Sequence, residues 1–168
     1  MGLMFRLMVT MLGGMVKADL HGKVETLVLA PPVKIYQLIS DVTRMGEWSP
    51  ECYRCEWLGG VAAPAVGARF KGHNRRGWRR WAVPCRVTAV EPGRAFAFET
   101  IPGGQVQTMW RYELEPAEGG TILQESFQVL WYTRGLIRLF GGSQRRLAQM
   151  EEGVRQTLGR IKAAAEAR

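Results

Sequence analysis

The chain has 168 residues, of which 46% are hydrophobic and 23% charged, and it carries a formal net charge of +8. This length suits one domain with a sizeable core, and the composition is that of an ordinary soluble globular protein rather than a strongly biased one. The basic excess favours acidic partners, which include nucleic acid, an anionic membrane surface and an anionic ligand, but it does not choose among them.

The first residues are apolar, with one basic residue, Arg6, and a break at Gly13-Gly14. The apolar run is shorter than the ~20 residues that a membrane-spanning helix needs. No small-x-small cleavage site of a signal peptide follows it. We therefore expect residues 1–18 to lie outside the fold, as an over-long start or a frayed extension, with a weak membrane anchor as the alternative. Residues 19–168 would form the domain.

From residue 23 onward the pattern of polar and apolar residues predicts a series of short elements. Prolines at 31 and 32 are well placed to open a helix, and Ser49-Pro50 marks the end of a second one. Glycine-containing turns then separate segments with a period of two. The predicted strands are 23–29, 53–58, 67–74, 78–90, 95–100, 105–115 and 121–130, and the predicted helices are 31–39, 41–48 and 143–165.

The last helix has one apolar stripe along its whole length. Its members recur at spacings of three, four and seven: Leu147, Met150, Val154, Leu158, Ile161 and Ala165. Strands joined by short turns must be antiparallel, and such a sheet also has one face to bury. The simplest solution is an α+β fold in which a curved antiparallel sheet of about seven strands wraps around helix 143–165 and leaves a pocket between them.

Three cysteines, Cys52, Cys55 and Cys85, are too few for a disulfide framework and odd in number, so we expect a reducing, cytoplasmic compartment. The Cys52-x-x-Cys55 spacing could belong to a zinc site with Cys85 and His73. No second Cys-x-x-Cys or paired histidine motif accompanies it. We therefore expect buried or half-buried thiols in strands, and neither a metal nor a cofactor.

Four segments, in order, resemble the polyketide cyclase/dehydrase and lipid-transport family of the START-like, helix-grip superfamily. They are residues 30–51 (APPVKIYQLISDVTRMGEWSPE), 67–75 (GARFKGHNR), 91–98 (EPGRAFAF) and 110–121. The resemblance implies a hydrophobic cavity between sheet and long helix that binds lipids, polyketides or other small apolar molecules. Some relatives cyclise or dehydrate a bound polyketide, and others carry or sense a ligand. None of the cyclases' catalytic residues matches a position of this chain.

Glu125 is the best candidate for a polar group in such a cavity. It has the strand parity of Leu123, Phe127 and Val129, and a carboxylate on an otherwise apolar face is costly unless it is paired or protonated. The alternative is that this face turns outward near a sheet edge. If the first interpretation holds, Glu125 is the candidate catalytic acid or base.

Two further candidates have equally plain structural alternatives. Trp48 would line the mouth of the cavity and stack on a flat ligand, or it would lock the second helix in the core. Asn74 shares the parity of Phe70 and would bind a ligand oxygen, although we favour a role in the turn at 75–77. The full set of predicted ligand-binding residues is Trp48, Phe70, Asn74, Trp110, Tyr112, Glu125, Phe127, Met150 and Val154.

Two basic segments bear on the choice of partner. The arginines of residues 75–80, with Trp78 and Trp81, form either a nucleic-acid patch or a hairpin tip with aromatic flanks. We favour the hairpin and expect no nucleic-acid partner. Residues 130–140 are too apolar for a plain loop and would form a short helix that gates the cavity, or one that contacts an anionic membrane.

These patterns together predict a protein that binds a small hydrophobic ligand in a cavity between sheet and helix. An enzyme of the polyketide cyclase or dehydratase type, using Glu125, is one alternative. A basic module for membrane or partner contact, using residues 130–140, is another.

Overall fold

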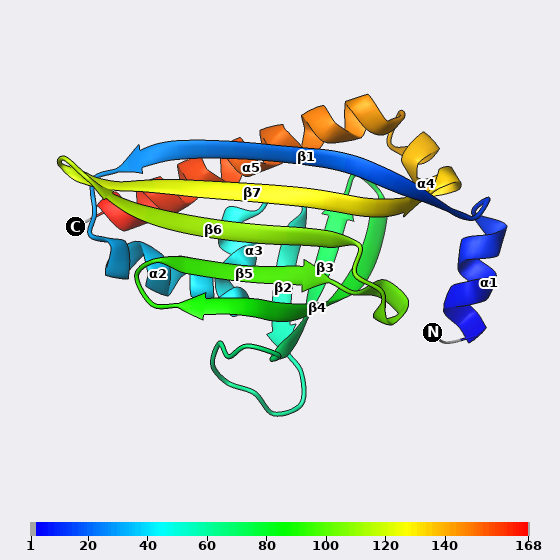
Figure 1. Cartoon of the computed structure of the whole chain (residues 1–168), viewed down its shortest axis with the longest axis horizontal. Coiled ribbons are helices and arrows are strands. Elements are labelled where there is room, and N and C mark those ends of the chain that lie inside the picture. The colour runs from blue at the N-terminus through cyan, green and yellow to red at the C-terminus, as the bar shows by residue number, and fades with distance from the viewer. Residues whose placement is uncertain (1–2, 168) are drawn as a thin grey trace.

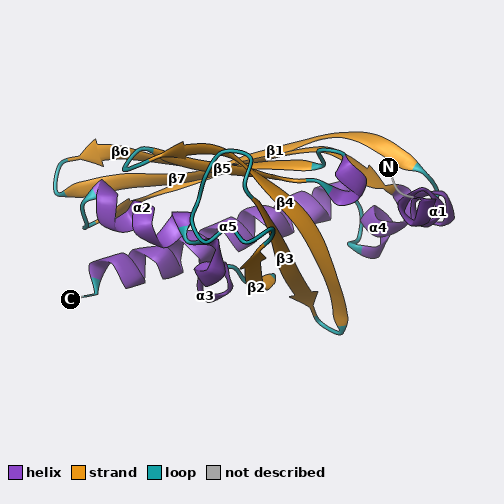
Figure 2. Cartoon of the chain, turned by 90° about the horizontal axis from the view of Figure 1, so that it is seen from below, coloured by secondary structure: helices purple, strands orange, loops and turns teal. Residues whose placement is uncertain are grey.

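The computed structural model describes residues 3–167 and has two layers, a curved antiparallel sheet and a long helix lying across its concave face (Figures 1 and 2). The order of the strands in the sheet is β1-β7-β6-β5-β4-β3-β2. This arrangement confirms the predicted helix-grip fold. The strands are β1 (Met15–Val28), β2 (Cys52–Trp57), β3 (Arg69–Arg76), β4 (Arg79–Glu91), β5 (Ala95–Thr100), β6 (Thr108–Ala117) and β7 (Gly120–Thr133).

The helices stand at the ends and on the concave side of this sheet (Figure 2). The α-helices are α1 (Leu3–Met11), α2 (Pro32–Ser40), α3 (Met45–Trp48), α4 (Arg134–Leu139) and α5 (Ser143–Glu166), and short 3-10 turns occupy Val42–Arg44 and Pro102–Gly104. Among the described residues, no helix is both long and apolar enough to cross a membrane.

Helix α5 is held by the stripe that the sequence predicts. Its buried residues include Met150, Val154, Leu158, Ile161 and Ala165, and it packs mainly against β1. Fully burying a large aliphatic side chain contributes about 1.5–3 kcal/mol, so this stripe is a major source of the attachment between the two layers.

Strand β1 begins at Met15, well before the predicted residue 23. It pairs with β7 from Met15 opposite Thr133 to Val28 opposite Thr121, with one irregularity between Lys17 and Leu20. Residues 15–18, which we had expected outside the fold, therefore belong to the sheet. The physical reason is that β7 continues to Thr133 and offers backbone partners that no local pattern in residues 15–22 reveals.

Helix α3 and the turn before it dock tightly on β2. Asp41 Oδ1 accepts a hydrogen bond from the Thr43 backbone N–H at 3.0 Å and so caps the short turn, as Asp typically does at a helix start. Gly46 of α3 lies against the carbonyl of Tyr53, where any Cβ would collide with the backbone. The glycine therefore lets α3 approach the sheet edge directly.

The β3–β4 hairpin, with Arg76 and Arg79 at its tip, extends past α5 on the side where α4 also lies (Figure 2). Gly77 at the turn has φ +58°, a left-handed conformation that glycine adopts without strain. The arginine-rich stretch is thus a hairpin tip with Trp78 exposed beside it.

Candidate functional site

The concave face of the sheet carries a row of aromatic rings that come from four strands, β3, β5, β6 and β7. Phe70 of β3 meets Phe98 of β5 edge-on, with ring centroids 5.3 Å apart. Phe98 stacks on Trp110 of β6 at 6.3 Å, and Trp110 contacts Phe127 of β7 at 5.4 Å. The alternation of each strand places these side chains inward, so the interior between sheet and α5 is largely aromatic.

Glu125 lies within this apolar interior. It is only 4% exposed, on the inner face of β7 directly opposite Tyr112 of β6. Burial raises the pKa of the Glu125 carboxyl to about 8, although a hydrogen bond from the Tyr112 hydroxyl acts in the opposite direction. The carboxyl is therefore mostly protonated at neutral pH.

The polar pair is not fully satisfied. Glu125 Oε2 is buried and has no hydrogen-bond partner among the residues that the structure describes. Burial, followed by the neighbouring Glu125 carboxyl, raises the pKa of Tyr112 well above its ordinary value, so its hydroxyl stays a donor. A buried polar atom without a partner costs stability, and a ligand atom is one way to remove that cost.

Helix α5 and strand β1 complete the wall around Glu125. Met150 and Val154 of α5 are buried in the same core as Phe127. Gly22 of β1 pairs with Phe127, and a Cβ at Gly22 would stand 2.6 Å from Phe127 Cζ. The glycine therefore lets the ring lie flat across the neighbouring strand.

Two thiols also point into the interior from β2. Cys52 and Cys55 are both buried, with their sulfur atoms 3.4 Å apart, and the Cys55 sulfur is 3.7 Å from Met45 Sδ. Residues three apart in a regular strand point to opposite faces, but the register shifts between Cys52 and Arg54 and brings both thiols to one face. In the described part of the chain, no group of three or more Cys, His, Asp or Glu side chains is arranged to hold a metal.

Trp48 and Asn74 lie apart from the other predicted ligand-binding residues. Trp48 is 6% exposed, and its carbonyl accepts a hydrogen bond from Arg160 of α5 at 3.2 Å. This position supports the interpretation that it locks α3 in the core, although its buried Nε1 has no partner among the described residues. Asn74 is half-buried, and its amide lies 3.4 Å from the Gly72 carbonyl rather than in the 75–77 turn.

The predicted residues thus fall into two groups. Phe70, Trp110, Phe127 and the Tyr112–Glu125 pair meet on the concave face, and the two α5 residues cover them. Trp48 and Asn74 lie toward the β2–β3 end. Phe98 links Phe70 to Trp110, and Trp110 contacts Phe127, so aromatic rings take up part of the space in which we expected a pocket.

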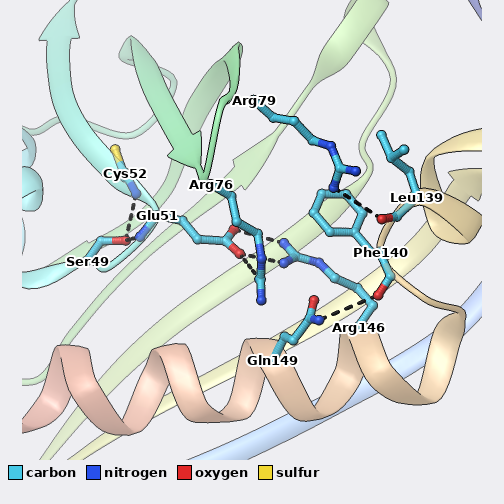
Figure 3. Close-up of polar contacts among 9 residues, drawn as sticks. All are labelled: Ser49, Glu51, Cys52, Arg76, Arg79, Leu139, Phe140, Arg146 and Gln149. Carbon is cyan, nitrogen blue, oxygen red and sulfur yellow. Dashed lines mark hydrogen bonds and ion pairs between the residues drawn. The ribbon is translucent and has the colours of Figure 1, made fainter.

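A second polar cluster, which the sequence analysis did not find, lies where β3 and α5 come together (Figure 3). Both carboxylate oxygens of Glu51 accept hydrogen bonds from Arg146 of α5, at 2.6 and 3.0 Å. Arg76 of β3 donates to Glu51 Oε1 at 2.7 Å. Burial opposes ionisation of Glu51, but the two guanidinium groups outweigh it and hold the pKa of this carboxyl below its ordinary value.

Two hollows adjoin this cluster. One has a volume of about 600 Å³ and the other about 410 Å³, and they share Arg76, Arg145 and Gln149. We call the two together the rim groove. Its lining residues are Pro50, Glu51, Arg75, Arg76, Gly77, Arg79, Arg138, Leu139, Phe140, Gly141, Arg145, Ala148, Gln149, Glu152, Gly153 and Gln156.

Segment 130–140 lies at the end of the molecule that holds the rim groove. Trp131 is buried, and its indole N–H donates to the Val106 carbonyl at 2.8 Å. Phe140 meets Trp81 edge-on at 6.2 Å, and the Arg146 guanidinium lies 4.4 Å from the Phe140 ring. These aromatic side chains contact the protein itself.

An antiparallel sheet that grips one long helix around an apolar interior defines the helix-grip class of proteins. Residues 15–166 match the family described as polyketide cyclase / dehydrase and lipid transport, and the chain belongs to that family. No protein with a curated description matches the sequence.

Several solved structures are similar to this one. The polyketide-cyclase-like protein Cgl2372 from Corynebacterium glutamicum is 32% identical, with a TM-score of 0.50, and the alignment covers 90% of this chain and 88% of that one. Protein CV1439 from Chromobacterium violaceum is 17% identical, with a TM-score of 0.67 and coverage of 88% and 99%. The di-domain ARO/CYC StfQ from the steffimycin biosynthetic pathway is 15% identical, with a TM-score of 0.71, and the match covers 88% of this chain and 51% of StfQ.

Proposed function

We propose that this protein binds a small, largely apolar ligand, of lipid or polyketide type, between the sheet and α5, and that Glu125 anchors a polar atom of that ligand. One observation carries the proposal: Glu125 Oε2 is buried and without a partner among the described residues, inside an aromatic wall. A neutral carboxyl in such surroundings can both donate and accept a hydrogen bond.

The surrounding side chains support a flat or chain-like apolar ligand. Phe98, Trp110 and Phe127 present ring faces and edges, on which apolar molecules pack well. Trp110 is only half-buried, so its ring is the one that can move with least loss of packing. Membership of a family that includes polyketide cyclases and lipid-transport proteins is consistent with this ligand class.

The test uses the neutral fluorescent probe N-phenyl-1-naphthylamine. The wild-type protein should bind it, and Val154→Trp, which fills the interior from α5, should abolish binding. Val33→Trp is the matched control, because Val33 is 60% exposed on α2. Equal binding to the wild-type protein and Val154→Trp would place the probe elsewhere and contradict the proposal. If only Val154→Trp loses binding, native mass spectrometry of protein purified from its own host would give the mass of the natural ligand.

A catalytic role is the second candidate, and the same carboxyl favours it. With a pKa of about 8, Glu125 holds a proton at neutral pH and can give it to a bound carbonyl or hydroxyl group. The Tyr112 hydroxyl would then stabilise the carboxylate that remains. Such a proton transfer would assist cyclisation or dehydration of a polyketide-like substrate. Glu125→Gln should abolish turnover and leave binding intact, and surviving turnover would exclude this role.

We also infer a cytoplasmic location, because the three cysteines are free although two of their sulfur atoms lie 3.4 Å apart. Thiol alkylation of rapidly quenched cells, followed by mass spectrometry, tests this inference. Recovery of Cys52 and Cys55 as alkylated thiols is expected, whereas recovery as a disulfide would contradict it.

A further inference from the structure

The rim groove holds far more positive than negative charge. Five arginines line it, Arg75, Arg76, Arg79, Arg138 and Arg145, and the carboxylates are Glu51 and Glu152. Glu51 is already bound by Arg76 and by Arg146 behind it, so it neutralises little of the rest. The groove therefore presents a field that attracts anions.

Among the residues that the structure describes, four of the five arginines, all except Arg76, form no ion pair with a carboxylate. Of these four, Arg75, Arg138 and Arg145 are exposed. They come from three elements, the β3–β4 hairpin, α4 and the start of α5, and they line two adjoining hollows.

Two of the donors in the groove, Arg76 and Arg79, are also held in place by hydrogen bonds. Arg79 donates to the Leu139 carbonyl at 3.2 Å, and its Nε is buried with no acceptor in the described part of the chain. Glu51 fixes the Arg76 guanidinium at 2.7 Å, which leaves other N–H groups of Arg76 free to bind. Fixed donors lose less conformational entropy when a ligand binds than mobile surface side chains do.

We propose that the rim groove is a binding site for a phosphate group, distinct from the apolar interior and independent of any ligand there. The planar guanidinium fork matches the oxygens of a phosphate, and several converging forks suit its double negative charge better than the single charge of a carboxylate. The hollow of about 600 Å³ leaves room for the organic part of a phosphate ester. The phosphate could be that of a free ester or of a lipid headgroup, because both present the same oxygens.

Calorimetric titration with inorganic pyrophosphate tests the site directly. We expect one site per chain at low salt, with an affinity that falls as salt rises. Arg75→Gln/Arg145→Gln should weaken binding by about 100-fold, because each of the two lost charged hydrogen bonds costs roughly tenfold. Both side chains are exposed and form no ion pair among the described residues, and Arg75 lies 5.7 Å from the centre of the Tyr53 ring. A cation–π contact at an exposed site contributes only about 0.5–1 kcal/mol, so the melting temperature should change little.

The matched control is Arg69→Gln/Arg94→Gln, which removes the same charge from two exposed positions outside the groove. Pyrophosphate affinity should stay within about twofold of the wild type, since only distant charge is lost. An equal loss in both double variants would show nonspecific attraction and overturn the proposal. No binding of pyrophosphate or of phosphate-bearing vesicles would overturn it as well.

A second titration separates the two sources of phosphate. Phosphatidylcholine vesicles with and without phosphatidate are compared, each in the presence and absence of pyrophosphate. Arginine-dependent binding to phosphatidate vesicles, displaced by pyrophosphate, would identify a lipid headgroup, and binding of pyrophosphate alone would identify a soluble ester. Affinity for single-stranded oligonucleotides that rises with length, with none for pyrophosphate, would replace the proposal by nucleic-acid binding.

Discussion

Two buried or nearly buried carboxyl groups, Glu125 and Glu51, have opposite protonation states in the same small domain. Glu125 is 4% exposed in the aromatic interior, with one hydroxyl partner, and burial raises its pKa to about 8. The Glu51 side chain is 24% exposed at the rim, and burial also acts to raise its pKa. Arg146 and Arg76 reverse that effect, and Glu51 is ionised.

The difference shows that partners, rather than burial alone, decide the charge of a carboxyl group in this fold. The side-chain partner of Glu125 is the neutral hydroxyl of Tyr112, an environment that suits a site for uncharged, apolar molecules. The rim offers Glu51 two permanent cations, which suits a site for anions.

Removing the ionisable group at Glu125 should change how stability depends on pH. In the unfolded chain this carboxyl loses its proton near pH 4.5, and in the native protein near pH 8. Between these values the native state holds the extra proton, so the wild-type free energy of unfolding falls as pH rises. Glu125→Gln has no such proton to lose. Its free energy of unfolding should therefore fall less between pH 5 and pH 9 than that of the wild type, by on the order of 4 kcal/mol. Urea unfolding at each pH measures this, and parallel pH profiles would contradict it.

Glu51→Gln should destabilise the protein by about 3 kcal/mol at neutral pH, because it leaves two guanidinium groups facing each other without a counter-charge. The pKa of Glu51 is lowered, so its contribution is present above the ordinary pKa of 4.5 and is lost as pH falls through the native value. The cost of the substitution should therefore shrink in acid. Glu118→Gln, at an exposed turn, is the control and should have no effect. A loss equal to that of the control would contradict the pairing.

Gly22→Ala should destabilise the protein by about 2 kcal/mol, because its Cβ would meet Phe127 Cζ and force the ring out of the aromatic row. The matched variant is Gly159→Ala, in helix α5, where no atom lies within 4 Å of the added Cβ. That change should stabilise the protein by about 0.5–1 kcal/mol through helix propensity alone. Denaturant midpoints of the two variants should thus move in opposite directions, and a neutral Gly22→Ala would show that Phe127 is not held there.

Tyr112→Phe should have the smallest effect on stability, about 1 kcal/mol, the usual net contribution of one hydrogen bond. Its informative effect is on Glu125: the Tyr112 hydroxyl lowers that pKa, so its loss should move the titration of Glu125 to higher pH. Carboxyl-carbon NMR follows the titration. A shift toward lower pH would mean that Tyr112 donates elsewhere.

Much of the fold and part of the site follow from the sequence. Alternation in the strands and the stripe of α5 predict the two layers, and the parity of Glu125 with Phe127 predicts an inward carboxyl, because these signals are local and periodic. The start of β1 at Met15 depends on the far end of β7, so no local pattern reveals it. The same holds for Glu51, whose partners Arg76 and Arg146 are 25 and 95 positions away along the chain.

One irregularity of the sheet shows why strand parity alone can mislead. Cys52 and Cys55 have opposite parity, yet their sulfur atoms lie 3.4 Å apart because the register of β2 shifts between them. Bulges of this kind depend on how a neighbouring strand pairs, which periodicity does not encode.

The central claim is that the interior holds a protonated Glu125 available to a ligand, and its NMR titration tests this most directly. The carboxyl-carbon shift of Glu125, assigned by its absence in Glu125→Gln, would be followed with and without N-phenyl-1-naphthylamine. We predict a midpoint near pH 8 in the free protein and a higher midpoint when the apolar probe excludes water further. A midpoint near that of a solvent-exposed carboxyl, about 4.3, would mean that water reaches Glu125 freely and would contradict the account.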